Sequence, residues 1–136
     1  MTLSGRAVSR SEMLGYPDTP FSFGSVIAIQ ADRAEELWPL IGMLPPTRLK
    51  LSCVQFHIER PALENVAAVT ASINLDGTFD LPLSAGPYLF FLSDVLGQPS
   101  VGGMDVVGCA HGVVEDEPAF VSLSYGEEGV QVLGAP

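Results

Sequence analysis

Short apolar runs, many of them alternating with polar residues, recur along most of the chain and are separated by glycine and proline. Such runs are typical of β-strands, and their spacing of about eight to twelve residues favours a sandwich over a barrel. We therefore predict an all-β fold, an antiparallel β-sandwich of about eight strands with one short helix in an insertion. The expected strands cover Gly5–Arg10, Ser25–Gln30, Leu49–Ile58, Asn65–Ile73, Thr78–Leu83, Tyr88–Ser93, Asp105–Val114, Ala119–Tyr125 and Val130–Leu133.

The clearest turn signals lie between Val69 and Asp94. Asp76-Gly77 stands between two alternating runs, which is a strong hairpin signal because both turn residues are expected to accept a positive φ. Ala85-Gly86-Pro87 marks a second turn, so three strands in series are expected to form an antiparallel meander. Pro82 has no donor for a strand ladder, which predicts that its strand is an edge strand or is bulged.

Two of the expected strands have no polar face. Residues 26 to 29, Val-Ile-Ala-Ile, form a continuous apolar run of largely β-branched type. This composition predicts a central strand that is covered on both faces. Tyr88 to Leu92 are all aromatic or aliphatic, so that strand must be buried on at least one face.

The segment from Asp32 to Pro61 is a long insertion, whose first part precedes the expected strand Leu49–Ile58. Asp32 is followed by Glu35 at capping-box spacing, which predicts a short helix that Pro39 ends or kinks. We interpret the large apolar residues here as a lid over one end of the core. The alternative is a contact surface for a ligand or for a second copy of the chain. These residues are Leu37, Trp38, Leu40, Ile41 and Leu44.

Length and charge narrow the class of protein. The 136 residues fit a single domain, 1–136, and no uncharged apolar run approaches the ~20 residues of a membrane span. Met1–Arg6 lacks the features of a secretory signal, so we expect a soluble, cytoplasmic protein. Sixteen acidic and six basic residues give a net charge of −10, which repels phosphate backbones and anionic lipid. Nucleic acid and membranes are therefore not expected as partners.

Several segments in order resemble the carboxypeptidase regulatory-like domain, a prealbumin-like (transthyretin-like) sandwich. The similar segments are Ser4–Val8, Gly24–Ile29, Asp76-Gly77-Thr78-Phe79 and Gly86-Pro87-Tyr88. The resemblance implies a prealbumin-like topology and a binding or accessory module without an activity of its own. The hydroxyisourate hydrolases share that fold and use several histidines, whereas this chain has two.

The two cysteines and two histidines fall into two close pairs, Cys53-x-x-x-His57 and Cys109-x-His111. Residues two or four apart on a strand share a face, so the four side chains would form a tetrahedral zinc or copper(I) site if the strands meet. The alternative is two small buried cysteines and two exposed or hydrogen-bonded histidines. A thiol with a nearby imidazole could also act as a nucleophile if it lay in a cleft.

The chain shows no nucleophile elbow, phosphate-binding loop or His-Glu-x-x-His motif. We therefore expect a non-enzymatic binding or interaction module without a cofactor, whose partner is a protein or small ligand, with self-association into a homodimer. A metal-binding protein is the first alternative. The second alternative is a small-molecule carrier with an inter-sheet pocket. Separately, the polar residues Asn74, Asp76 and Asp80 could form a weak calcium site. The expected pocket residues are Trp38, Phe79, Tyr88 and Phe90.

Overall fold

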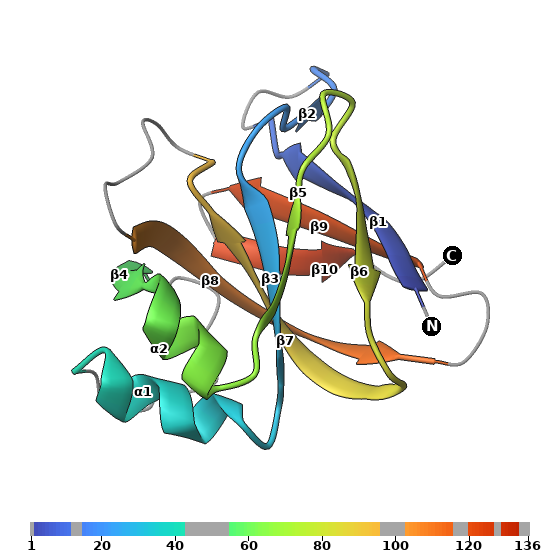
Figure 1. Cartoon of the computed structure of the whole chain (residues 1–136). Coiled ribbons are helices and arrows are strands. Elements are labelled where there is room, and N and C mark those ends of the chain that lie inside the picture. Colours follow the sequence, from blue (N-terminus) through green and yellow to red (C-terminus); the bar gives the residue numbers. More distant parts are fainter. Residues whose placement is uncertain are drawn as a thin grey trace.

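The computed structural model describes residues 2–11, 15–42, 55–95, 103–115, 120–126 and 129–133. Within these residues ten strands form two facing sheets, and the short helices lie to one side (Figure 1). The all-β sandwich is therefore confirmed. The strands are β1 (Thr2–Ser9), β2 (Thr19–Pro20), β3 (Ser25–Gln30), β4 (Gln55–Glu59), β5 (Val69–Ser72), β6 (Thr78–Pro82), β7 (Gly86–Ser93), β8 (Gly103–Val114), β9 (Phe120–Gly126) and β10 (Gly129–Leu133).

The first sheet, here called the β1 sheet, has the order β10-β9-β1-β2, and β6 also pairs with β1. One edge of β1 is shared, because Thr2–Arg6 pair with β6 while Val8 and Ser9 pair with β2. The other edge of β1 pairs in parallel with β9. The antiparallel pairing of β9 with β10 confirms the last expected hairpin.

The second sheet, here called the β7 sheet, has the order β4-β8-β7-β3-β5 with antiparallel pairing throughout. β3 lies between β7 and β5, and Val26 to Ile29 are buried. The prediction of a central strand covered on both faces is confirmed. The register of β8 on β7 shifts between Phe90 and Leu92, which marks a bulge in β8.

Two apolar clusters hold the fold together, one on each face of the β7 sheet. The inner core fills the space between the sheets and includes Ala7, Phe79, Leu81, Phe90, Leu92 and Leu123. The outer core lies beneath the helices and includes Ile27, Ile29, Leu37, Trp38, Leu63 and Phe91. Burial of apolar area at about 25 cal/mol per Å² on both faces stabilises this sheet.

The turn at Asp76-Gly77 forms where expected, but the predicted meander is wrong. β5 pairs with β3 in the β7 sheet, whereas β6 pairs with β1 in the other sheet. β7 then returns to the β7 sheet, so three successive strands alternate between the two layers. Alternation of apolar residues determines which side of a strand is buried, and it contains no information on the partner strand.

The insertion forms a 3-10 turn, η1 (Ala34–Glu36), followed by α1 (Leu37–Leu40). The helix is confirmed, but the capping box is wrong, because the N-cap of η1 is Arg33 and no side chain caps it. Arg33 pairs with Glu36, and its Nη2 donates to the carbonyl oxygen of Asn65 at 2.9 Å. The second contact joins the insertion to α2 (Arg60–Asn65).

The expected strand Asn65–Ile73 is shorter in the structure, because α2 precedes it and β5 begins at Val69. The sequence analysis missed α2. Pro61 ends β4 as expected, and it also occupies the first turn of α2, where the missing N–H of proline costs nothing. None of the helices in the described part of the chain has the length and apolar character needed to cross a membrane.

Candidate functional site

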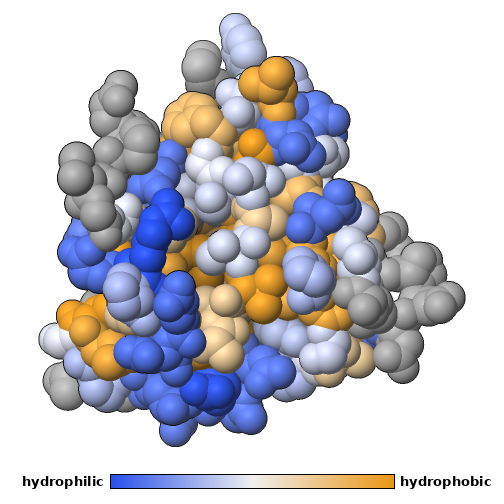
Figure 2. Space-filling model, in the orientation of Figure 1, coloured by the Kyte–Doolittle hydropathy of each residue, from blue (hydrophilic) through white to orange (hydrophobic). Residues whose placement is uncertain are grey.

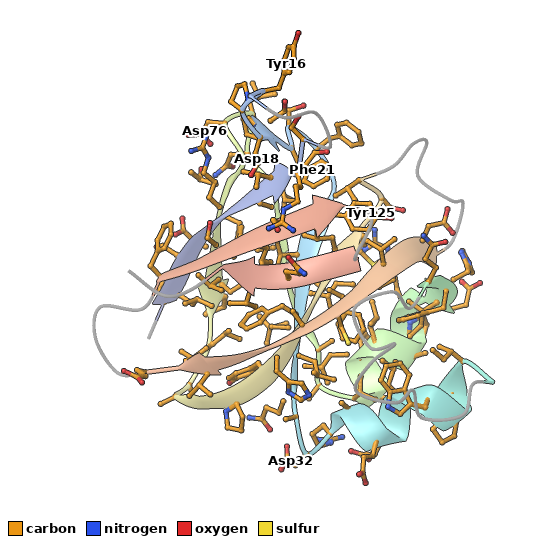
Figure 3. All side chains as sticks on the ribbon, turned by 180° about the vertical axis from the view of Figure 1, so that it is seen from behind. Tyr16, Asp18, Phe21, Asp32, Asp76 and Tyr125 are labelled. Carbon is orange, nitrogen blue, oxygen red and sulfur yellow. The ribbon has the colours of Figure 1, made fainter. Side chains whose placement is uncertain are left out.

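Three large apolar side chains are exposed at one end of the sandwich. Leu75 is 86% exposed, Tyr16 64% and Phe23 50%. Figure 3 shows Tyr16 projecting from this end, with Asp18, Phe21 and Asp76 behind it. We call Tyr16, Asp18, Phe23, Leu75 and Asp76 the apical surface. Figure 2 shows apolar side chains at the end of the molecule where β5 turns into β6.

Leu75 is held outward by the turn that joins β5 to β6. The N–H of Gly77 donates to the carbonyl oxygen of Asn74 at 2.9 Å, and the N–H of Asn74 donates to that of Thr78 at 2.8 Å. Gly77 has a φ of 88°, and Asp76 does not have a positive φ, so only the glycine needs conformational freedom here. These bonds fill the inner side of the turn, which leaves the side chain of Leu75 in solvent.

Asp76 stabilises the same turn from its outer side. Its Oδ1 accepts a hydrogen bond from the hydroxyl of Thr78 at 2.5 Å and another from the N–H of Thr78 at 3.1 Å. The first of these bonds is the main reason that the pKa of Asp76 is lowered. Arg6 contributes least to this shift. The carboxylate of Asp76 is therefore ionised at neutral pH.

The turn rests on the segment that carries Phe23. The N–H of Ala7 donates to the carbonyl oxygen of Gly77 at 2.8 Å. The N–H of Phe21 donates to the carbonyl oxygen of Ala7 at 3.0 Å. The N–H of Ile73 donates to the carbonyl oxygen of Gly24 at 3.0 Å. A Cβ on Gly77 would lie 2.8 Å from the Cβ of Pro20, so the two segments are in close contact. The apical surface therefore has a fixed base.

The loop before β2 supplies Tyr16 and Asp18. Oδ1 of Asp18 accepts a hydrogen bond from the N–H of Ser11 at 2.9 Å, which ties the two sides of the loop together. Pro17 and Pro20 restrict the backbone on each side of Asp18. Tyr16 directly precedes Pro17 and projects from the end of the sandwich at which Asp76 also lies (Figure 3).

The predicted metal ligands have a different location. His57 lies on the edge strand β4, where its Nδ1 is 3.1 Å from Oδ1 of Asp105 and its Nε2 is 3.5 Å from Oε1 of Glu59. The hydrogen bond with Asp105 is the largest cause of its raised pKa. Two hydrogen bonds join Asp105 to Asp94. The N–H of Asp94 donates to the carbonyl oxygen of Asp105, and the N–H of Asp105 donates to Oδ1 of Asp94.

Cys109 and His111 share the opposite face of the same sheet. Cys109 belongs to the outer core, and His111 pairs with Leu89, another outer-core residue. The neighbours of His57 on β4 also face the outer core, so His57 itself points the other way. Burial raises the pKa of the Cys109 thiol to about 12, which disfavours the thiolate that a metal or a nucleophilic reaction requires.

The described members of the predicted metal set therefore do not converge. No group of three or more histidine, cysteine or acidic side chains that could hold a metal ion occurs in residues 2–11, 15–42, 55–95, 103–115, 120–126 and 129–133. Cys53 lies outside the described residues. The two ring nitrogens of His57 contact carboxylates on opposite sides of the ring, an arrangement that fits a bridged ion pair.

The predicted contact surface in the insertion is mostly core. Leu37 and Trp38 are buried in the outer core, where the Trp38 ring lies 6.4 Å from Phe91 and 6.5 Å from Phe56, measured between ring centroids. Leu40 is 47% exposed, and Ile41 is half-buried against the same cluster. Leu44 lies outside the described residues. The described part of this segment covers the β7 sheet, as expected of a lid.

The four residues expected to line a carrier pocket do not lie around one space. Phe79, Tyr88 and Phe90 are buried in the inner core, and Trp38 lies on the other side of the β7 sheet in the outer core. The hydroxyl of Tyr88 donates to the carbonyl oxygen of Ser84 at 3.0 Å, which fixes the turn before β7. A hollow of about 280 Å³ lies nearby on the surface, between the end of β3 and the start of β7.

Tyr16, Phe23 and Leu75 were not predicted from the sequence, because each is a single apolar residue in a turn-rich segment. A signal was available for Leu75, which stands between Asn74 and Asp76-Gly77. A leucine at the tip of a tight turn has no neighbouring layer to bury it. Tyr16 and Phe23 lie in a turn-rich segment that contains two prolines, Pro17 and Pro20, one on each side of Asp18.

Comparison of the chain with protein-family models, with curated proteins and with solved structures found no match. The similarity to carboxypeptidase regulatory-like domains therefore stays a prediction. The all-β sandwich rests on the sheets described above.

Proposed function

We propose that this protein is a non-enzymatic interaction module that binds a protein partner through its apical surface. The observation that carries the proposal is the 86% exposure of Leu75 at the tip of a hydrogen-bonded turn, together with the exposure of Tyr16 and Phe23 in the segment that leads into β3. An exposed leucine of this kind does nothing for the fold. Its burial in a complex would remove apolar area from water.

The composition of the apical surface fits protein recognition. Aromatic side chains such as Tyr16 and Phe23 supply large contact areas at low cost in side-chain entropy, and tyrosine is enriched among residues that dominate binding energies. The backbone beneath them is fixed by the bonds of Ala7, Gly24 and Gly77. A preformed surface binds more tightly than a flexible one, because less conformational freedom is lost on association.

A capture experiment with matched variants tests this function. Wild-type protein, Leu75→Ser and Val113→Ser would each be immobilised and exposed to an extract of the native cells. Val113 is a suitable control because it is 71% exposed on β8, outside the apical surface. We expect wild type and the Val113 variant to retain the same partner and the Leu75 variant to lose it. Equal capture by all three proteins would contradict the proposal.

A further inference from the structure

We infer that the partner presents a cationic surface around an apolar centre. This inference rests on the proposed function and adds the chemistry of the partner to it. Its basis is the position of two carboxylates: Figure 3 shows Asp18 and Asp76 at the end of the sandwich from which Tyr16 projects, and Asp76 directly follows exposed Leu75. Both belong to the loops that carry Tyr16 and Leu75, so a partner that covers those side chains also meets the carboxylates.

Both carboxylates accept hydrogen bonds from the backbone of this chain. Asp18 accepts a hydrogen bond from the N–H of Ser11, and Asp76 accepts from the N–H and the hydroxyl of Thr78. Each is exposed, so its other lone pairs face solvent. A lysine or arginine of a partner would meet acceptors that are already oriented, which reduces the entropy lost on forming the pair.

The charge of the whole chain points to the same partner. Sixteen acidic residues against six basic ones produce a negative field over the protein. The positive charge of Arg6 lowers the pKa of Asp76, and among the causes of that shift it is the smallest. Opposite charge on a partner would accelerate the encounter and fix its orientation.

Other occupants of the apical surface are disfavoured by the same charges. A second copy of the chain docked end to end would bring Asp18 and Asp76 against the same carboxylates of its partner, and like charges in contact oppose association. A membrane rich in anionic lipid would be repelled as well. A neutral apolar surface would leave both carboxylates partly desolvated and unpaired, at a cost in affinity.

A peptide titration followed by amide NMR tests the inference on the full chain. Three synthetic peptides of equal length would be used, in which leucine alternates with lysine, serine or glutamate. We expect the lysine peptide to shift the amide signals of Tyr16, Asp18, Phe23, Leu75 and Asp76, and the glutamate peptide to leave them unchanged. Salt at about 1 M, where the Debye length is about 3 Å, should weaken the lysine complex.

Paired variants show whether the apical carboxylates are responsible. Asp18→Asn with Asp76→Asn removes two charges and keeps the side-chain oxygens that accept hydrogen bonds. Glu35→Gln with Glu64→Gln removes two charges from exposed residues in η1 and α2, outside the apical surface. We expect the apical pair of substitutions to weaken the lysine peptide roughly three- to tenfold at low salt, and the control pair to weaken it much less.

The outcomes separate this inference from the proposed function. Equal apical binding of the serine and lysine peptides would overturn the cationic partner and leave the interaction module standing. Equal losses of affinity for the lysine peptide in the two double variants would also overturn the cationic partner, because binding would then follow net charge alone. Apical shifts with neutral phosphatidylcholine vesicles and none with peptides would replace the protein partner with a lipid surface and contradict both proposals.

Discussion

The outer core and the apical surface contain similar side chains in opposite surroundings. In the outer core, Leu37, Trp38 and Phe91 are at most 4% exposed, and the helices hold them against the β7 sheet. On the apical surface, Tyr16 and Leu75 are mostly in solvent. Leu37 and Trp38 are adjacent in the sequence and are buried together, whereas Tyr16 and Leu75 are single apolar residues at turns. The difference predicts that mutations in the two regions affect separate properties.

The largest expected effect comes from the outer core. Phe91→Ala removes a fully buried ring whose centroid lies 5.8 Å from that of Phe56 and 6.4 Å from that of Trp38. We expect the free energy of unfolding to fall by about 3–5 kcal/mol, because the substitution leaves a cavity. Urea denaturation followed by Trp38 fluorescence measures this loss. A loss below about 1 kcal/mol would show that the outer core is not a packed core.

A smaller loss is expected at the base of the apical surface. Gly77→Ala places a Cβ 2.9 Å from the carbonyl oxygen of Ala7 in a residue whose φ is 88°. We expect a destabilisation of about 2–3 kcal/mol, from backbone strain together with the close contact. Gly42→Ala is the control, since Gly42 has a φ of 72° and its added Cβ meets no described atom within 4 Å.

The control should cost about 1–2 kcal/mol, which is the cost of the backbone conformation alone. Chemical denaturation of both variants gives the comparison. If Gly77→Ala were no more destabilising than Gly42→Ala, the contact between the turn and Pro20 would not rigidify the apical surface.

At the surface itself, stability should hardly change. Leu75→Ser removes an 86% exposed side chain, so we expect the free energy of unfolding to stay within about 0.5 kcal/mol of wild type. Val113→Ser should behave in the same way. A calorimetric scan of each variant checks this, and it also ensures that a loss of binding by Leu75→Ser reflects the contact surface. A clear fall in melting temperature would mean that Leu75 packs in the folded state.

The smallest effect concerns a charge at the rim of the β7 sheet. The pKa of His57 is raised above the ordinary value of a histidine, chiefly by the hydrogen bond with Asp105. A raised folded pKa means that the pair stabilises the fold fully below pH ~6.5 and loses this contribution as the pH rises through the folded pKa. We expect an NMR titration to show the raised pKa and Asp105→Asn to lower it. An unchanged pKa in that variant would contradict the pairing.

Much of the fold could be predicted from the sequence, because burial on one or both faces of a strand appears directly in its apolar pattern. Val26 to Ile29 and the Asp76-Gly77 turn are the clearest cases. Strand partners could not be predicted, since alternation is the same whether β6 pairs with β5 or with β1. The helix α2 was missed because Pro61 was interpreted only as the end of a strand.

The candidate site was harder to predict than the fold. Cysteine and histidine attract attention by their chemistry, yet His57 and Cys109 lie on opposite faces of one sheet, because a bulge in β8 changes the alternation between Val107 and Cys109. The apical surface is built from residues far apart in the sequence, and only the fold brings Tyr16 and Asp76 to the same end (Figure 3).

Site-specific photo-crosslinking tests the central claim most directly. A photoreactive phenylalanine derivative would replace Leu75 in one preparation and Val113 in another, and each protein would be irradiated in the native cell extract. Our account predicts one discrete crosslinked partner from position 75 and none of that mass from position 113. The same crosslinked product from both positions, or a product from position 113 alone, would contradict the assignment of the apical surface as the binding site.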